Sequence, residues 1–324
     1  MEVPHQIVIG TRASTLACVQ ATLIQDAIHN QFPQIKTRLK TIKTQGDRIL
    51  DVALNKIGDK GLFIKELEHA LLAGEIDIAV HSMKDMPGEI ADDFVLHSAL
   101  QRDKPHDVLL FADSAVTKRA REKNSQSLAD LLPAGAIIGT SSLRREAQLK
   151  RQYPEFQCQL IRGNLQTRYK KLIHPTQGAH FDAIMLAAAG VHRLGWDDYI
   201  GYNFNPVANC IPSACQGILA VQYLANRKKQ LANVLDGLKH AETELFQQAE
   251  RAFLQAMAGG CQLPMGAHCF YDASLKQYQL LGIVLSPDGQ QAVRHQCAVS
   301  ENNPAQAGFE LAEMLKNKGA TAIL

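Results

Sequence analysis

Asp85 is the residue of this chain with the strongest case for doing chemistry, although its setting also allows a plainer interpretation. Residues 76–80, Ile-Asp-Ile-Ala-Val, predict a buried strand, and Asp85 follows just past its carboxyl end. Pro87 pushes Met86 toward extended geometry, so we expect Asp85 in a constrained loop that can face a cleft. A turn aspartate bonded to nearby amides would have the same local sequence. Position alone leaves both interpretations open.

A set of arginines stands where strands are expected to give way to helices. The set comprises Arg12, Arg144, Arg145, Arg162, Arg168 and Arg193. Guanidinium groups bind carboxylates through paired hydrogen bonds and stay charged when partly buried. A single arginine of this kind is usually only a surface charge. Loops past the carboxyl ends of strands are, however, where open α/β sheets bind ligands, so the set as a whole favours a small substrate with several carboxylates.

Two segments repeat one arrangement of a strand end, a glycine turn and hydroxyl residues that open a helix. The first is residues 9–14, which ends on Ser14, and the second is residues 138–142, with Thr140, Ser141 and Ser142. Such a segment points backbone N–H groups and a helix dipole at an anion, so each could hold a carboxylate. Ordinary Ser and Thr helix caps would give the same pattern.

Cys261 is the best candidate for covalent chemistry among the seven cysteines. It lies in a loop bounded by Gly259, Gly260 and Pro264, which is expected to expose the thiol. The chain has no paired CxxC spacing, so neither a disulfide framework nor a metal site is expected. A small residue tolerated in a loop remains the alternative for Cys261.

The elements that would position these residues alternate between short β-rich runs and amphipathic stretches. This alternation predicts βαβ units around largely parallel sheets, in two lobes separated near the polar residues 112–126. The last third differs, because a long helical pattern at residues 241–257 precedes three strand-like runs and a closing helix at 304–317. The turn Ser-Pro-Asp-Gly at 286–289 predicts a hairpin there. We therefore expect two α/β lobes and a small α+β domain.

Length and composition set the limits on function. At 324 residues the chain exceeds what one core usually serves. A net charge of +2 and 46% hydrophobic residues indicate no bulk attraction to nucleic acid or membranes. The N-terminus lacks the basic and apolar regions of an export signal, and no apolar run reaches membrane-spanning length, so we expect a cytoplasmic protein.

Together these segments resemble the porphobilinogen deaminase (hydroxymethylbilane synthase) family over nearly the whole chain. Six motifs match in the family's order, with Gln20 and Gly46-Asp47 as further matches. The motifs are residues 10–17 (GTRASTLA), 59–68 (DKGLFIKELE), 81–87 (HSMKDMP), 139–145 (GTSSLRR), 162–168 (RGNLQTR) and 259–264 (GGCQLP).

The resemblance implies a fold of two periplasmic-binding-protein-like (type II) lobes and a small C-terminal α+β domain. The first lobe would comprise residues 1–104 and 216–238, and the second residues 105–215. Residues 239–324 would form the domain that carries the cysteine loop. It also implies a return of the chain to the first lobe near Gln216, which periodicity does not show.

The implied activity is that of a transferase in tetrapyrrole (haem) biosynthesis. It deaminates porphobilinogen, joins the pyrroles head to tail and releases hydroxymethylbilane and ammonia. The family carries a covalent dipyrromethane cofactor as primer. Cys261 matches its thioether attachment and Asp85 its catalytic aspartate. The expected partner is the small-molecule substrate porphobilinogen, with no nucleic acid or membrane, and the expected state is a monomer.

Each pyrrole carries an acetate and a propionate, which accounts for the arginine set. By the family's pattern the cofactor-binding residues are Cys261, Lys84, Ser82, Thr140, Ser141, Ser142, Arg144, Arg145, Arg162 and Lys60. The substrate-binding residues are Arg12, Ser14, Arg162, Arg168, Arg193 and Gln20. Two positions depart from the pattern: Cys215 stands where the family usually has Gly, and His106 replaces a common Arg.

Two other functions fit part of the same sequence. The lobes and arginines alone would suit a non-catalytic binding protein for an anionic solute, although the lack of an export signal and the Cys261 domain count against it. A transferase that uses Cys261 as a turnover nucleophile is the second.

Overall fold

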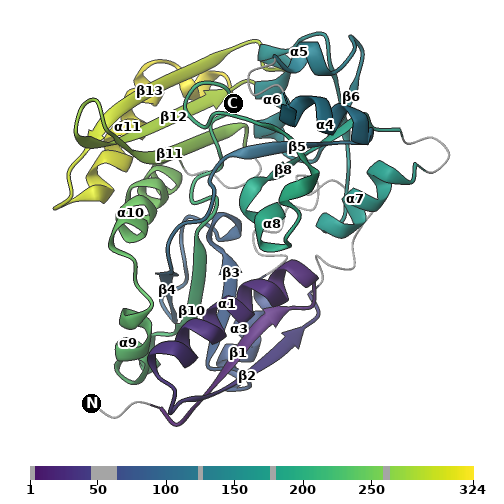
Figure 1. The fold of residues 1–324 in the computed structure, drawn as a ribbon. Coiled ribbons are helices and arrows are strands. Elements are labelled where there is room, and N and C mark those ends of the chain that lie inside the picture. Colours follow the sequence, from purple (N-terminus) through teal and green to yellow (C-terminus); the bar gives the residue numbers. More distant parts are fainter. Residues whose placement is uncertain (1–3, 45–63, 123–126, 176–179, 258–262) are drawn as a thin grey trace.

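The computed structural model describes residues 4–44, 64–122, 127–175, 180–257 and 263–324. Within these ranges the chain forms two lobes, each around a five-stranded sheet, and a third unit with a three-stranded sheet (Figure 1). The two α/β lobes with parallel-rich sheets and the small C-terminal α+β domain confirm the predicted fold class. No helix in the described ranges has the length and apolar character that crossing a membrane requires.

The first sheet is parallel on one side and antiparallel on the other. Its order is β2-β1-β3-β10-β4, where β1 runs parallel to both β2 and β3, and β10 runs antiparallel to β3 and β4. The strands are β1 (Gln6–Arg12), β2 (Lys36–Ile42), β3 (Ile78–Ser82), β4 (Phe94–Ala99) and β10 (Leu219–Leu224). The helices of this lobe are α1 (Thr15–Gln31), α3 (Lys65–Leu72) and α9 (Lys228–Gly237). The parallel strands β1 and β3 thus end at the same edge of the sheet.

The second sheet repeats this arrangement in the order β7-β6-β8-β5-β9, with β5 antiparallel to both of its neighbours. Its strands are β5 (Asp107–Phe111), β6 (Ile137–Thr140), β7 (Gln157–Leu160), β8 (Ala183–Ala187) and β9 (Ile200–Asn203). The helices are α4 (Ser114–Glu122), α5 (Leu128–Leu131), α6 (Leu143–Gln152), α7 (Leu165–Ile173) and α8 (Ala188–Arg193). The prediction that the lobes are separated near residues 112–126 is therefore wrong, because β5 precedes this stretch and α4 within it belongs to the second lobe.

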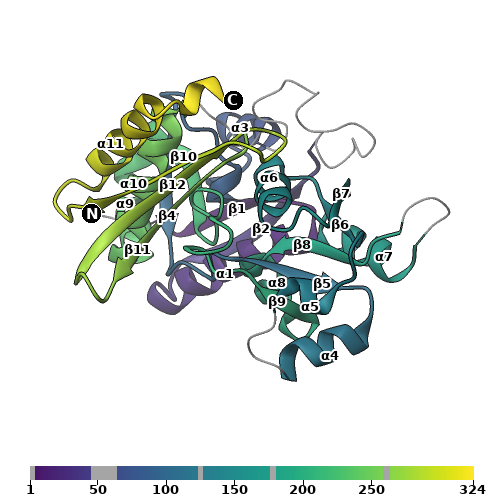
Figure 2. The ribbon, with the colours of Figure 1, turned by 90° about the horizontal axis from the view of Figure 1, so that it is seen from above.

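The third unit packs two helices against an antiparallel sheet. It comprises α10 (Ala241–Ala256), β11 (Met265–Asp272), β12 (Gln277–Leu285), β13 (Ala292–Val299) and α11 (Pro304–Asn317). The predicted hairpin joins β12 to β13, and Gly289 takes the positive φ of 76° that its turn requires. Gly308 lets the helices approach closely, since a Cβ there would lie 2.3 Å from the carbonyl oxygen of Ala249. Figure 2 shows α11 on the outside of this unit.

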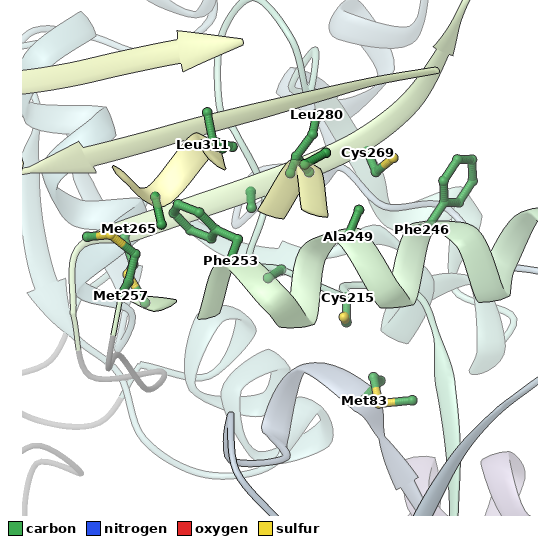
Figure 3. Packing of buried hydrophobic residues seen from close by; sticks show 14 of the residues in the cluster. Met83, Cys215, Phe246, Ala249, Phe253, Met257, Met265, Cys269, Leu280 and Leu311 are labelled. Carbon is green, nitrogen blue, oxygen red and sulfur yellow. The ribbon is translucent and has the colours of Figure 1, made fainter. Parts of the chain in front are cut away.

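The third unit shares a hydrophobic core with the first lobe. Phe253 and Ala249 of α10 pack with Leu280 and Leu311 of the same unit, and the cluster continues to Met83, which follows β3. Figure 3 shows Met83 and Cys215 on the opposite side of α10 from Leu280. The segment that carries Asp85 is thereby anchored to the third unit as well as to its own sheet.

Candidate active site

Asp85 lies at the end of a short turn between two buried methionines, Met83 and Met86. A single 3₁₀ turn, η2 (Met83–Asp85), follows β3, and Met86 is extended at φ −79° and ψ 141°, as Pro87 predicts. Met83 and Met86 are 0% and 2% exposed, whereas Asp85 is exposed. The backbone N–H of Met83 also donates to the carbonyl oxygen of Ile218, 2.9 Å away. The carboxylate is therefore held outward by two buried neighbours.

The charge of Asp85 acts on an arginine of the other lobe, Arg168. Burial lowers the pKa of Arg168 to about 10, with further lowering by the charges of Arg145 and Arg162, while the negative charge of Asp85 opposes the shift. The charges of Asp85, Arg145 and Arg162 therefore all act on Arg168. Arg168 is held by α7, and its Nε donates to the carbonyl oxygen of Gly163 at 2.8 Å. The sequence-predicted aspartate thus interacts electrostatically with one member of the arginine set, Arg168, from the other lobe.

Lys84 is the half-buried neighbour of Asp85 in the same turn. Burial lowers its pKa to about 8, with Arg145 and Arg144 contributing and with Asp85 and Asp107 opposing. Its Nζ donates to the Oε1 of Gln216 at 3.1 Å. An ammonium group among arginines in this position gains from any carboxylate that binds beside it.

Arg144 and Arg145 are both bound to one buried carboxylate, Asp107. Arg144 Nη1 lies 2.8 Å from Asp107 Oδ2, and Arg145 donates to Oδ1 from Nε at 3.0 Å and from Nη2 at 2.8 Å. The arginines are 3% and 6% exposed and Asp107 is 0% exposed. Burial alone would raise the pKa of Asp107, but the two guanidinium groups outweigh it and hold that pKa well below its usual range. Sequence reasoning missed Asp107.

Further contacts tie the two arginines to the second lobe. Arg145 Nη1 donates to the carbonyl oxygen of Met185 at 3.1 Å, and Arg144 Nη1 donates to that of Ile211 at 2.7 Å. With one carboxylate between two guanidinium groups, the cluster keeps an excess positive charge.

Each of the two glycine turns supplies one serine, Ser14 or Ser142, that caps the helix after it. Ser14 Oγ accepts from the backbone N–H of Ala17 at 3.3 Å, and Ser142 Oγ accepts from that of Arg145 at 3.5 Å. Thr140 Oγ1 accepts from the N–H of Ser142 at 3.2 Å, and Ser141 lies between them, half-buried. Ser14 and Ser142 thus cap α1 and α6, and the binding of an anion at either segment stays a prediction.

The other predicted residues of the first lobe lie around the ends of β1 and β3. Arg12 ends β1 and is half-buried. Gln20, buried in α1, donates from Nε2 to the Oγ of Ser82 at 2.8 Å, so α1 is tied to the strand that precedes Asp85. His81 in that strand contacts the Oε1 of Gln222 through Nε2 at 3.1 Å, and burial lowers the pKa of His81 to about 4.

Arg193 is bound to the segments that connect the lobes. Its Nε lies 3.2 Å from Asp103 Oδ2, and its Nη2 donates to the carbonyl oxygen of Gly217 at 2.6 Å. Arg162 follows β7 and is half-buried. Two predicted residues, Lys60 and Cys261, lie outside the described residues, as do Gly46-Asp47 and residues 59–63, the first half of the motif at 59–68.

The two departures from the family pattern have clear structural settings. Cys215 is buried with a φ of 61°, a conformation that glycine adopts without strain. His106 is half-buried, and its Nε2 contacts Asn203 Oδ1 at 3.1 Å. No group of three or more metal-ligating side chains occurs in the part of the chain that the structure describes.

The fold and this site define a class: a two-lobed α/β protein with an exposed carboxylate opposite buried cations. The family model "Porphobilinogen deaminase, dipyromethane cofactor binding domain" matches residues 7–232, and "Porphobilinogen deaminase, C-terminal domain" matches residues 245–317. The chain belongs to the porphobilinogen deaminase family.

Relatives match over almost their full length. The porphobilinogen deaminase of Desulforamulus reducens is 41% identical over 320 residues, which cover 99% of this chain and 97% of that protein. That of Syntrophomonas wolfei subsp. wolfei is 42% identical over 316 residues, 98% of this chain and 97% of that protein. Among solved structures, the alkanesulfonate-binding protein SsuA from Xanthomonas axonopodis pv. citri is 12% identical, covers 80% of each chain and has a TM-score of 0.37.

Proposed function

We propose that this chain is a porphobilinogen deaminase that works on a dipyrromethane primer held by Cys261. It removes ammonia from porphobilinogen, adds each pyrrole to the primer, and finally releases hydroxymethylbilane by hydrolysis. The observation that carries the proposal is the placement of Asp85 on a fixed turn of one lobe, where its charge acts on Arg168 of the other lobe together with Arg145 and Arg162.

The charges of the site fit a group with several carboxylates. Asp107 offsets one of the two guanidinium groups bound to it, and Lys84 adds a third cation whose pKa is lowered by burial and by those neighbours. Arg168 is likewise half-buried, and burial lowers its pKa to about 10. Carboxylates bound beside Lys84 and Arg168 would raise the pKa of both side chains again. Binding is therefore favoured, because the charged forms of both side chains are stabilised. The acetates and propionates of a dipyrromethane supply such groups.

The proposed roles of the remaining residues follow the family's pattern. The cofactor would be attached to Cys261 and bound by Lys84, Ser82, Thr140, Ser141, Ser142, Arg144, Arg145, Arg162 and Lys60. Porphobilinogen would be bound by Arg12, Ser14, Arg162, Arg168, Arg193 and Gln20. For Arg144, the contacts with Asp107 and Ile211 leave its Nε as the buried atom without a partner.

Asp85 would act through its charge and through hydrogen bonds. Loss of ammonia from the aminomethyl group leaves a positive charge on the substrate, which a carboxylate fixed nearby stabilises. The same oxygens can accept hydrogen bonds from pyrrole N–H groups and take up the proton that the terminal pyrrole of the growing chain loses after its free carbon attacks the substrate. When bound, the dipyrromethane supplies the free pyrrole carbon onto which the chain grows. The fixed turn keeps Asp85 in place, so little reorganisation accompanies the reaction.

We further propose a cytoplasmic monomer with no nucleic-acid partner. Its first lobe would comprise residues 1–104 and 216–238, its second lobe residues 105–215, and its C-terminal domain residues 239–324. The pairing of β10 with β3 and β4 supports the return of the chain to the first lobe after residue 215.

The experiment compares Asp85→Asn with the control Glu89→Gln, which removes an exposed carboxylate four residues further on. With porphobilinogen as substrate, ammonia and tetrapyrrole are measured together. We expect Asp85→Asn to lower kcat by about 100-fold or more and Glu89→Gln to stay near the wild type. An Asp85→Asn enzyme within about threefold of wild type would exclude the proposed role. Binding of porphobilinogen without turnover by the wild type would favour a binding protein.

A further inference from the structure

Gln216 lies between the two segments that connect the lobes, next to Lys84 and Asp107 of the candidate site. The chain passes from β4 to β5 through residues 100–106 and returns from β9 to β10 through residues 204–218. Gln216 is on the returning segment, is 1% exposed, and contacts the first crossing segment as well as both lobes. A buried side chain between two lobes can act on the geometry of a site without touching its ligand.

The hydrogen bonds of Gln216 fix the orientation of its carboxamide. Its Oε1 accepts from Lys84 Nζ at 3.1 Å. Its Nε2 donates to the carbonyl oxygen of Pro105 at 2.7 Å and to Asp107 Oδ1 at 3.0 Å, with the carbonyl oxygen of His106 at 3.3 Å. An ammonium group only donates and an ionised carboxylate only accepts, so the opposite amide orientation would lose these bonds.

This orientation joins the cations of the two lobes through one side chain. On one side Gln216 accepts a hydrogen bond from Lys84, in the turn of Asp85. On the other side it donates to Asp107, which forms salt bridges with Arg144 and Arg145. Without a link, Lys84 and the arginine pair would repel one another where the two lobes meet. The carboxamide gives each side a hydrogen-bond partner and sets the separation of the two groups.

We propose that Gln216 is a positioning residue that couples Lys84 to Asp107 and so fixes the spacing between the carboxylate-binding cations of the two lobes. This inference rests on the proposed function, because its cations are those assigned there to primer and substrate. The new inference is that Gln216 acts through Lys84 and Asp107. Gln216 itself does not contact the reacting groups.

Two variants of Gln216 give opposite effects on Lys84. Gln216→Met keeps the length of the side chain but removes an acceptor from the ammonium group, so the pKa of Lys84 should fall further. Gln216→Glu places a carboxylate beside Lys84, so that pKa should rise, while the donor to Asp107 is lost. The matched control is Gln279→Met, since Gln279 is also a buried glutamine, 4% exposed, but lies in β12 of the third unit.

The experiment uses the purified full-length protein and measures acetylation of Lys84 by acetic anhydride as a function of pH, read by peptide mass spectrometry. We expect the midpoint to move to lower pH in Gln216→Met, to higher pH in Gln216→Glu, and to stay unchanged in Gln279→Met. For porphobilinogen, KM should rise about tenfold in both Gln216 variants, with a smaller change in kcat.

Equal Lys84 profiles in the wild type and both Gln216 variants would overturn the proposal, and so would shifted profiles with an unchanged KM. If Gln216→Met does not fold, Gln216→Glu carries the same test. The acetylation profile can be measured without substrate. If the wild-type protein does not turn over porphobilinogen, the proposed function is rejected, but the profile still tests the role of Gln216.

Discussion

Replacing Arg102 with methionine should destabilise the protein by about 3 to 5 kcal/mol, because it leaves a buried carboxylate without its counter-ion. Arg102 lies between β4 and β5, and its Nη1 donates to Glu250 Oε1 of α10 at 2.7 Å. The two side chains are 5% and 0% exposed. The pair therefore joins the inter-lobe connection to the third unit.

The contacts around Glu250 show why the cost should be large. Its carboxylate also accepts from the backbone N–H of Cys269 at 2.7 Å and from that of Cys215, so it cannot turn toward solvent without losing both. Glu250→Gln keeps an acceptor and removes the charge, and should cost less, about 1 to 3 kcal/mol. In the double variant neither charge remains buried, so its cost should fall below the sum of the two by at least about 1 kcal/mol.

Urea unfolding followed by far-UV circular dichroism measures these differences. Arg121→Met is the matched control, since it breaks an ion pair with Asp198 whose side chains are 51% and 89% exposed. That control should change stability by less than about 1 kcal/mol. The reasoning is refuted if Arg102→Met costs no more than Arg121→Met, or if the costs of Arg102→Met and Glu250→Gln add without coupling.

Two further predictions concern the titration of buried groups. Burial lowers the pKa of Lys84 to about 8 in the chain without a primer, so acetylation of Lys84 by acetic anhydride in the Cys261→Ser protein should have its midpoint near pH 8. Primer carboxylates should move that midpoint to higher pH in the wild type, and equal midpoints in the two proteins would contradict this origin. Burial lowers the pKa of His81 from 6.5 to about 4, so the folded protein binds fewer protons than the unfolded one between these values and loses stability as the pH falls through them. Urea unfolding at pH 7 and pH 4.5 measures this loss in the free energy of unfolding. His81→Gln should remove a loss of about 3 kcal/mol or less between the two pH values. An equal loss in the wild type and in His81→Gln would count against a buried neutral His81.

The parallel half of each sheet could be predicted from the sequence, and the antiparallel half could not. β1, β3, β6 and β8 stand out as apolar runs in regular alternation with helices. β10 is just as apolar, but periodicity does not show that it inserts between β3 and β4, whose pairing partners lie more than 100 residues away. Only the resemblance to a family supplied that return.

In the site, too, features with local causes could be predicted from the sequence, and features that depend on distant residues could not. The extended Met86 and the outward Asp85 follow from Pro87 and from the apolar residues beside it, which are local features. The use of Arg144 and Arg145 to hold Asp107 depends on a partner 37 and 38 residues away, and no spacing rule connects them. A signal was present, since Asp107 begins an entirely buried strand, where an unpaired carboxylate would be costly.

The attachment of a primer to Cys261 is the central claim, and intact-protein mass spectrometry tests it most directly. The wild-type protein, purified without denaturation, should carry the added mass of one dipyrromethane, and the Cys261→Ser protein should have the mass of the bare chain. An unmodified wild-type chain in a preparation that converts porphobilinogen to hydroxymethylbilane would contradict the account.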